Sequence, residues 1–193
     1  MIGHDTESWM YMAKETIDYN KSHDDVTLWT NSMFGGMPTY QISMTQPANL
    51  IKYVEDIIHL YPNTVYNLML YLIGFYILLL AFGLKPWLAI VGAIAFSFAS
   101  YNFIIIAAGH NSKAITIAYM APLIGGVFMA FGSKKIIGSL ITAIFLSLAV
   151  RANHVQILYY TFFILLFFGV VEFIYSIKNK EINHFFNPLG LCS

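Results

Sequence analysis

Charged side chains are scarce in this sequence: Asp, Glu, Lys and Arg make up 10% of its 193 residues. A soluble globular domain carries roughly 25%. Hydrophobic residues make up 58% of the chain, so we expect a lipid bilayer, rather than water, to surround most of it. The aromatic share of 17% is typical of proteins whose rings anchor at membrane interfaces.

Cysteine is nearly absent, since Cys192 is the one cysteine of the chain. A single cysteine excludes a disulfide framework or a thiolate metal site within one chain. The sequence also lacks the clustered basic patch of a nucleic-acid-binding protein, so nucleic acid is not an expected partner. Residues 3–7 are polar, and no signal peptide follows Met1.

Long apolar segments predict an all-α integral membrane protein with about five transmembrane helices. A helix needs roughly 20 apolar residues to cross the hydrocarbon core. A polar segment with short interfacial helices, residues 1–63, precedes this core, and a polar tail, residues 178–193, follows it. The expected spans are residues 64–84, 86–108, 114–131, 136–150 and 155–177, of which 136–150 is short.

Two local signals stand out within residues 1–63. The stretch from Asn31 to Pro38 reads as a loop with a tight turn, because Gly35 and Gly36 can take positive φ angles. Residues 49–60 read as a short amphipathic helix, with Asn49 as its N-cap.

The distribution of charge predicts the orientation in the membrane. Five basic residues lie in the turns at one end of the spans and two at the other, and the positive-inside rule places the first set in the cytoplasm. Residues 1–63, which hold eight acids and three bases, then share the non-cytoplasmic side with loops 109–113 and 151–154. An acidic segment on that side needs a preceding span, so we expect an upstream helix before Met1. We also expect the tail to be truncated.

Polar side chains gather by topology at the non-cytoplasmic ends of the spans, where a polar group at membrane depth is costly and often functional. The predicted catalytic acids are Asp5 and Glu7. The predicted substrate-binding residues are Trp29, His110, Asn111, Lys113, Arg151, Asn153, His154 and Gln156.

These residue types suit a lipid-linked, phosphate-bearing sugar. Lys113 and Arg151 can neutralise a phosphate, and Asp5 or Glu7 can act as general base or hold a divalent cation through oxygen ligands. The amides suit sugar hydroxyls, the imidazoles can donate hydrogen bonds or shuttle protons, and Trp29 can stack on a sugar face.

Each residue also has a simpler interpretation. Lys113 and Arg151 could only extend to lipid head groups. A histidine in a loop is more often structural than catalytic, and Asn153 could only cap the fifth span. Zinc binding by His110 and His154 lacks a third defined ligand, so we predict no metal site of that kind.

Three motifs resemble those of the YfhO-like family of bacterial membrane proteins. The stretch LWTNSMFGGMP at residues 28–38 resembles that family's LWN…FGGMP loop and is the most specific. The segments GHNSK at 109–113 and ANHVQ at 152–156 resemble its Bacteroidetes members and support the likeness by order and spacing. The resemblance spans almost the whole chain.

The resemblance implies the N-terminal part of a C-type membrane glycosyltransferase in the bacterial inner membrane. Such an enzyme transfers a sugar from a polyprenyl-phosphate-linked donor to a cell-surface acceptor, on the non-cytoplasmic side. Asp5 matches the acid near the start of the family's first outer loop, and Glu7 is a nearby second acid. In that family a first span would precede Met1, in agreement with the topology argument.

Under this interpretation, Asp5 accepts a proton from the acceptor hydroxyl or orients it, and Lys113 and Arg151 stabilise the departing lipid phosphate. Two rival functions stay open. A transporter or flippase of lipid-linked or small polar substrates predicts polar residues near mid-depth and broken helices. A non-catalytic membrane scaffold predicts that Asp5, Lys113 and Arg151 do not converge.

Overall fold

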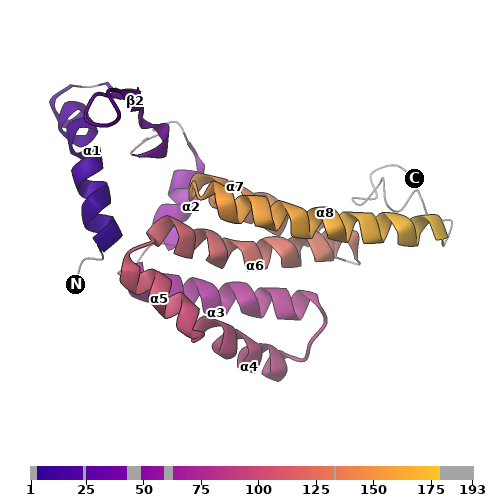
Figure 1. Cartoon of the computed structure of the whole chain (residues 1–193). Coiled ribbons are helices and arrows are strands. Elements are labelled where there is room, and N and C mark those ends of the chain that lie inside the picture. Colours follow the sequence, from indigo (N-terminus) through magenta and orange to yellow (C-terminus); the bar gives the residue numbers. More distant parts are fainter. Residues whose placement is uncertain (1–3, 24, 43–48, 59–62, 133, 179–193) are drawn as a thin grey trace.

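The computed structural model describes residues 4–23, 25–42, 49–58, 63–132 and 134–178, with the backbone alone for residues 4–6, 41, 58 and 63. These residues form eight α-helices, one short 3₁₀ helix and one small β-hairpin. Figure 1 shows the helices from α3 onward running along a common direction, with α1 and the hairpin at one end of them. The all-α prediction is confirmed in this coarse form.

The N-terminal segment is more regular than expected. Helix α1 (His4–Ser22) is followed by an antiparallel hairpin of β1 (Trp29–Thr30) and β2 (Met37–Pro38). The 3₁₀ helix η1 (Thr39–Gln41) and helix α2 (Ile51–Ile58) come next. Gly35 and Gly36 take φ angles of +74° and +119°, which confirms the predicted turn. Asn49 caps α2 as predicted, because the Ile51 N–H donates to its Oδ1 at 3.0 Å.

The core consists of helices packed around α6. The helices are α3 (Asn63–Ala81), α4 (Pro86–Ser97), α5 (Ser100–Ala108), α6 (Asn111–Phe131), α7 (Lys135–Arg151) and α8 (Val155–Lys178). Helix α6 packs against both α3 and α7, and 61% of its span is buried within the protein.

Among the described residues, three helices are long and apolar enough to cross a membrane: α3, α6 and α8. The pair of α4 and α5 adds a fourth if it counts as one bent span. Helix α7, with 17 residues, is roughly 26 Å long, slightly less than the ~30 Å hydrocarbon core. The chain thus has membrane-spanning character, whereas the count of five spans stays a prediction.

The predicted span 86–108 contains a break, because α4 and α5 meet at a bend of 45°. The chain becomes extended at Ala99, with φ −61° and ψ 135°. Nearby polar side chains hydrogen-bond the backbone around this break: Ser97 Oγ donates to the Ala93 carbonyl and Asn102 Nδ2 to the Phe96 carbonyl, each at 2.7 Å. Side chains of this kind allow a helix to bend without a proline.

Glycines bring α6 and α7 close together. A Cβ placed on Gly126 would lie 2.8 Å from the Thr142 nitrogen, and one on Gly138 would lie 2.3 Å from the Ala130 nitrogen. Neither position has room for a methyl group. Small residues of this kind are what lets membrane helices approach closely.

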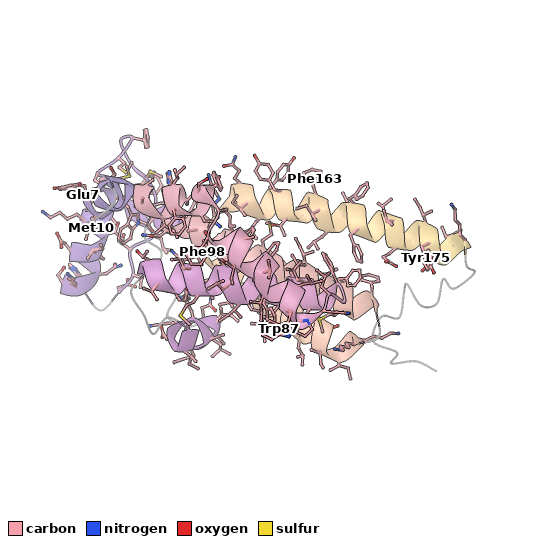
Figure 2. The ribbon with its side chains drawn as sticks, turned by 90° about the horizontal axis from the view of Figure 1, so that it is seen from below. Glu7, Met10, Trp87, Phe98, Phe163 and Tyr175 are labelled. Carbon is pink, nitrogen blue, oxygen red and sulfur yellow. The ribbon has the colours of Figure 1, made fainter. Side chains whose placement is uncertain are left out.

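Helix α8 is different, because only 11% of its span is buried. Its exposed face is rich in aromatic and branched aliphatic side chains. In Figure 2, Phe163 points away from the other helices, and Tyr175 lies at the end of the molecule opposite Glu7 and Met10 of α1. This face suits contact with lipid.

Candidate functional site

The two loops that carry most of the predicted site lie at the same end of the helical core. Helix α6 starts where its antiparallel neighbour α7 ends, and Figure 1 shows α2 and the N-terminal segment at this end too. The charges of Lys113 and His110 both act on the imidazole of His154. The structure therefore brings these three predicted residues into one electrostatic neighbourhood.

The environment of His154 favours its neutral form. Partial burial lowers the pKa of this imidazole below its ordinary value of 6.5, and repulsion from Lys113 and His110 adds to the effect. A hydrogen bond to its own backbone acts in the opposite direction. An anion bound beside this group would relieve the repulsion and favour the charged imidazolium.

A pocket of about 300 Å³ opens next to His154, lined by Tyr40, Asn153, His154 and Val155. Asn153 has a φ angle of +55°, a conformation that asparagine tolerates better than most residues. Its Nδ2 donates to the Tyr40 carbonyl at 3.1 Å. The amide therefore ties the N-terminal segment to the loop between α7 and α8. At the start of α8 the Ile157 N–H donates to Nδ1 of His154 at 3.4 Å, so His154 rather than Asn153 caps this helix.

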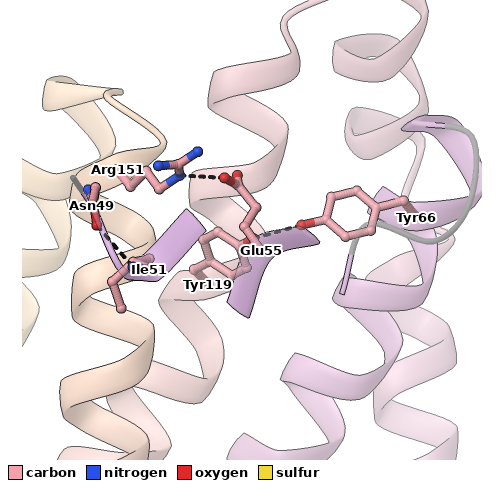
Figure 3. A network of polar contacts seen from close by, with 6 residues as sticks. All are labelled: Asn49, Ile51, Glu55, Tyr66, Tyr119 and Arg151. Carbon is pink, nitrogen blue, oxygen red and sulfur yellow. Dashed lines mark hydrogen bonds and ion pairs between the residues drawn. The ribbon is translucent and has the colours of Figure 1, made fainter. Parts of the chain in front are cut away.

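A second polar cluster lies at the same end (Figure 3). Arg151, the last residue of α7, donates from Nε to Oε2 of Glu55 on α2, and the two form an ion pair. Below them, the hydroxyls of Tyr66 and Tyr119 share a buried hydrogen bond of 2.7 Å. Glu55 and Arg151 both act electrostatically on Tyr119. The cluster joins four helices, α2, α3, α6 and α7.

The remaining loop residues have local partners. Lys113 Nζ lies 5.5 Å from the centre of the Tyr101 ring, a cation–π contact. Gln156 Nε2 donates to the Tyr160 hydroxyl one turn along α8, at 2.9 Å. Asn111 is the first residue of α6, and His110 is its N-cap residue.

Trp29 lies in the hairpin rather than in the loops of the core. Its indole Nε1 donates to Asn31 Oδ1 at 3.1 Å, and its ring lies against Gly36, where an added Cβ would be 2.9 Å away. About half of the side chain is exposed, at 53%. Its role in stacking on a sugar stays a prediction.

The two predicted catalytic acids lie near the start of α1. Asp5 belongs to the first turn, and its side chain is outside the described part of the structure. Glu7 is exposed. Within the described residues, no three His, Cys, Asp or Glu side chains gather where they could hold a metal ion. The divalent cation beside Asp5 stays a prediction.

Two other carboxylates, Glu15 and Glu55, make contacts that the sequence does not reveal. Oε2 of Glu15 accepts hydrogen bonds from the N–H groups of Asn31 and Ser32, at 3.1 and 2.9 Å, and from the Thr30 hydroxyl. The Thr30 bond is the main cause that lowers the Glu15 pKa below 4.5, with the bonds to Ser32 and Asn31 adding to it against a smaller effect of burial. Both acids look like ordinary solvent-exposed helix residues in the sequence.

Chemically, this end of the core can hold an anion. It combines a guanidinium, an ammonium and two imidazoles with amide donors beside a pocket, and guanidinium groups match phosphate oxygens particularly well. No family model, no curated protein and no solved structure matches the chain.

Proposed function

We propose that this chain is part of a membrane glycosyltransferase that takes a sugar from a polyprenyl-phosphate-linked donor and transfers it to a cell-surface acceptor. The observation that carries the proposal is a pocket beside His154, an imidazole on which the charges of His110 and Lys113, far away in the sequence, also act. Their charges suit the phosphate of the donor, and the pocket beside His154 offers amide and carbonyl groups for hydroxyls.

The motif resemblance supports the type of reaction and the role of the acid. Asp5 activates the acceptor hydroxyl as general base, and the cationic residues stabilise the lipid phosphate as it departs. Direct displacement of the phosphate predicts inversion at the anomeric carbon. The apolar helices of the core suit a donor whose lipid tail stays in the bilayer.

The test is sugar transfer by the intact protein in lipid vesicles, with a polyprenyl-phosphate-linked sugar as donor. Asp5→Ala is expected to lower the transfer rate by a factor of about 100 or more, because general-base catalysis contributes roughly 10²–10⁴. Asp18→Ala, which removes an acid from the same helix, is the matched control and keeps the wild-type rate. Full activity of Asp5→Ala would refute the proposed role of this acid.

A transporter of lipid-linked or small polar substrates is the second candidate, and two observations favour it. The bend between α4 and α5 is the broken helix expected of such proteins. Within the described residues, the fully buried Asn67, about one turn inside the start of α3, has no hydrogen-bond partner for either side-chain atom, and an unpaired polar group in a span is costly and often functional. Movement of the donor across vesicles without sugar transfer would select this function.

A further inference from the structure

Arg151 is held at one edge only. Its Nε bonds to Glu55, and both side chains are about a quarter exposed, at 26% and 22%. Within the described part of the chain, neither terminal nitrogen of the guanidinium has a hydrogen-bond partner. In Figure 3 the dashed line to Glu55 starts at one guanidinium nitrogen, and none is drawn from the other two. They form an open pair of donors, the geometry that binds two oxygens of a phosphate.

Glu55 is itself fixed in place. Ile51 and Val54, on the same short helix, pack against the buried core around Tyr66 and Tyr119. Asn49 caps the start of the helix. Packing therefore fixes the rotation of α2 about its axis, and with it the position of the Glu55 carboxylate, in the absence of a ligand.

We infer that Glu55 is a positioning residue, which orients Arg151 so that its two terminal nitrogens bind the phosphate of a lipid-linked ligand. This inference rests on the proposed function and names the ligand of Arg151 within it. An arginine side chain has many rotamers, and fixing it beforehand lowers the entropic cost of binding. Glu55 offsets the charge of Arg151, so Lys113 supplies further positive charge at this end of the core, and a bound anion would favour the charged form of His154.

The experiment measures binding of polyprenyl phosphate, and separately of inorganic phosphate, to the intact protein in nanodiscs of neutral lipid. Glu55→Ala is expected to weaken binding of polyprenyl phosphate about tenfold, a loss typical of a charge-assisted hydrogen bond. Glu55→Gln stays within about threefold of wild type, because its amide oxygen still accepts from Nε. Arg151→Lys weakens binding to a level that can still be measured although the charge is kept, since lysine cannot present two parallel donors.

Two further variants separate positioning from a structural role. In the Arg151→Lys background, Glu55→Ala is expected to cause no additional loss, because Glu55 acts through Arg151. Asp56→Ala removes the neighbouring exposed acid of α2 and is the matched control, with wild-type affinity. Equal affinity for polyprenyl phosphate and inorganic phosphate would support phosphate binding by the two terminal nitrogens of Arg151 and would identify free phosphate as the ligand.

Wild-type affinity of Glu55→Ala, or losses that add in the double variant, would overturn the inference and leave the proposed function standing. Phosphate binding that follows this pattern without any sugar transfer would overturn the proposed function alone. Failure of the wild-type protein to bind either probe would overturn both.

Discussion

Glu15 organises the β-hairpin through a single carboxylate oxygen, which accepts two backbone N–H groups and one hydroxyl. These bonds lower its pKa, with the Thr30 hydroxyl as the main cause. In the folded state the carboxylate therefore binds protons less readily than in an unfolded chain. Its contribution to the stability of the hairpin is present above the ordinary pKa of 4.5 and is lost as the pH falls through the lowered value.

We expect the amides of Asn31 and Ser32 to exchange hydrogen slowly at neutral pH and to lose protection, relative to an unfolded peptide, once the pH falls below 4.5. Glu15→Gln is expected to reduce the protection at neutral pH and to remove its dependence on pH, because the charged acceptor is gone. Asp18→Asn on the same helix serves as control. Unchanged protection in Glu15→Gln would contradict the anchoring role. Hydrogen exchange read by mass spectrometry provides the measurement.

At the residue scale, local rules could be read from the sequence and distant pairs could not. The positive φ angles of Gly35 and Gly36 and the cap at Asn49 depend only on neighbouring residues. The partner of Glu55 lies 96 residues away, and no sequence pattern identifies it. Sequence reasoning found Arg151 but assigned it a phosphate alone, whereas the structure adds a carboxylate partner.

Among the elements, the contact of α6 with α7 allows a direct test of packing. Gly138→Ala is expected to destabilise the protein by about 1–3 kcal/mol, the usual cost of overpacking, because its Cβ would lie 2.3 Å from a backbone nitrogen of α6. Gly169→Ala, in α8, meets no atom within 4 Å and is expected to leave stability nearly unchanged. Thermal unfolding in the same detergent compares the two, and equal stability would contradict the close contact.

At the scale of elements, the apolar segments predicted where the helices lie, but they did not predict the break between α4 and α5. No glycine or proline lies between Ser97 and Asn102, so no helix-breaking residue predicted a break there. The bend depends on side chains that bond to carbonyls of the helix. The long α1 was also underestimated, because its exposed residues follow no clear apolar periodicity.

For the whole molecule, the structure predicts which segments share a side of the membrane. The ion pair of Glu55 with Arg151 places α2 at the end of the core where α6 begins. In a Cys192→Ser background, we expect Asp56→Cys and Ser112→Cys to react with an impermeant maleimide from one face of sealed vesicles. Lys85→Cys and Lys134→Cys should react from the other. Labelling of Asp56→Cys and Ser112→Cys from opposite faces would contradict this arrangement.

The shared position of loops 109–113 and 151–154 was predictable at this scale, because alternating spans place alternate loops on one side. Which of the predicted residues touch was not. The charges of His110 and Lys113 act on His154, whereas Trp29 bonds within its own hairpin. Membrane topology fixes the side on which a residue lies, and only the packing of helices fixes its neighbours.

The 96 residues between Glu55 and Arg151 also set an order of events during synthesis. At a translation rate of about 5–20 residues per second, Arg151 emerges roughly 5–20 s after Glu55. Through that interval α2 lacks its ionic partner, and the Tyr40 carbonyl lacks the amide of Asn153. The two contacts that join the N-terminal segment to the end of α7 therefore form only after α7 has been made.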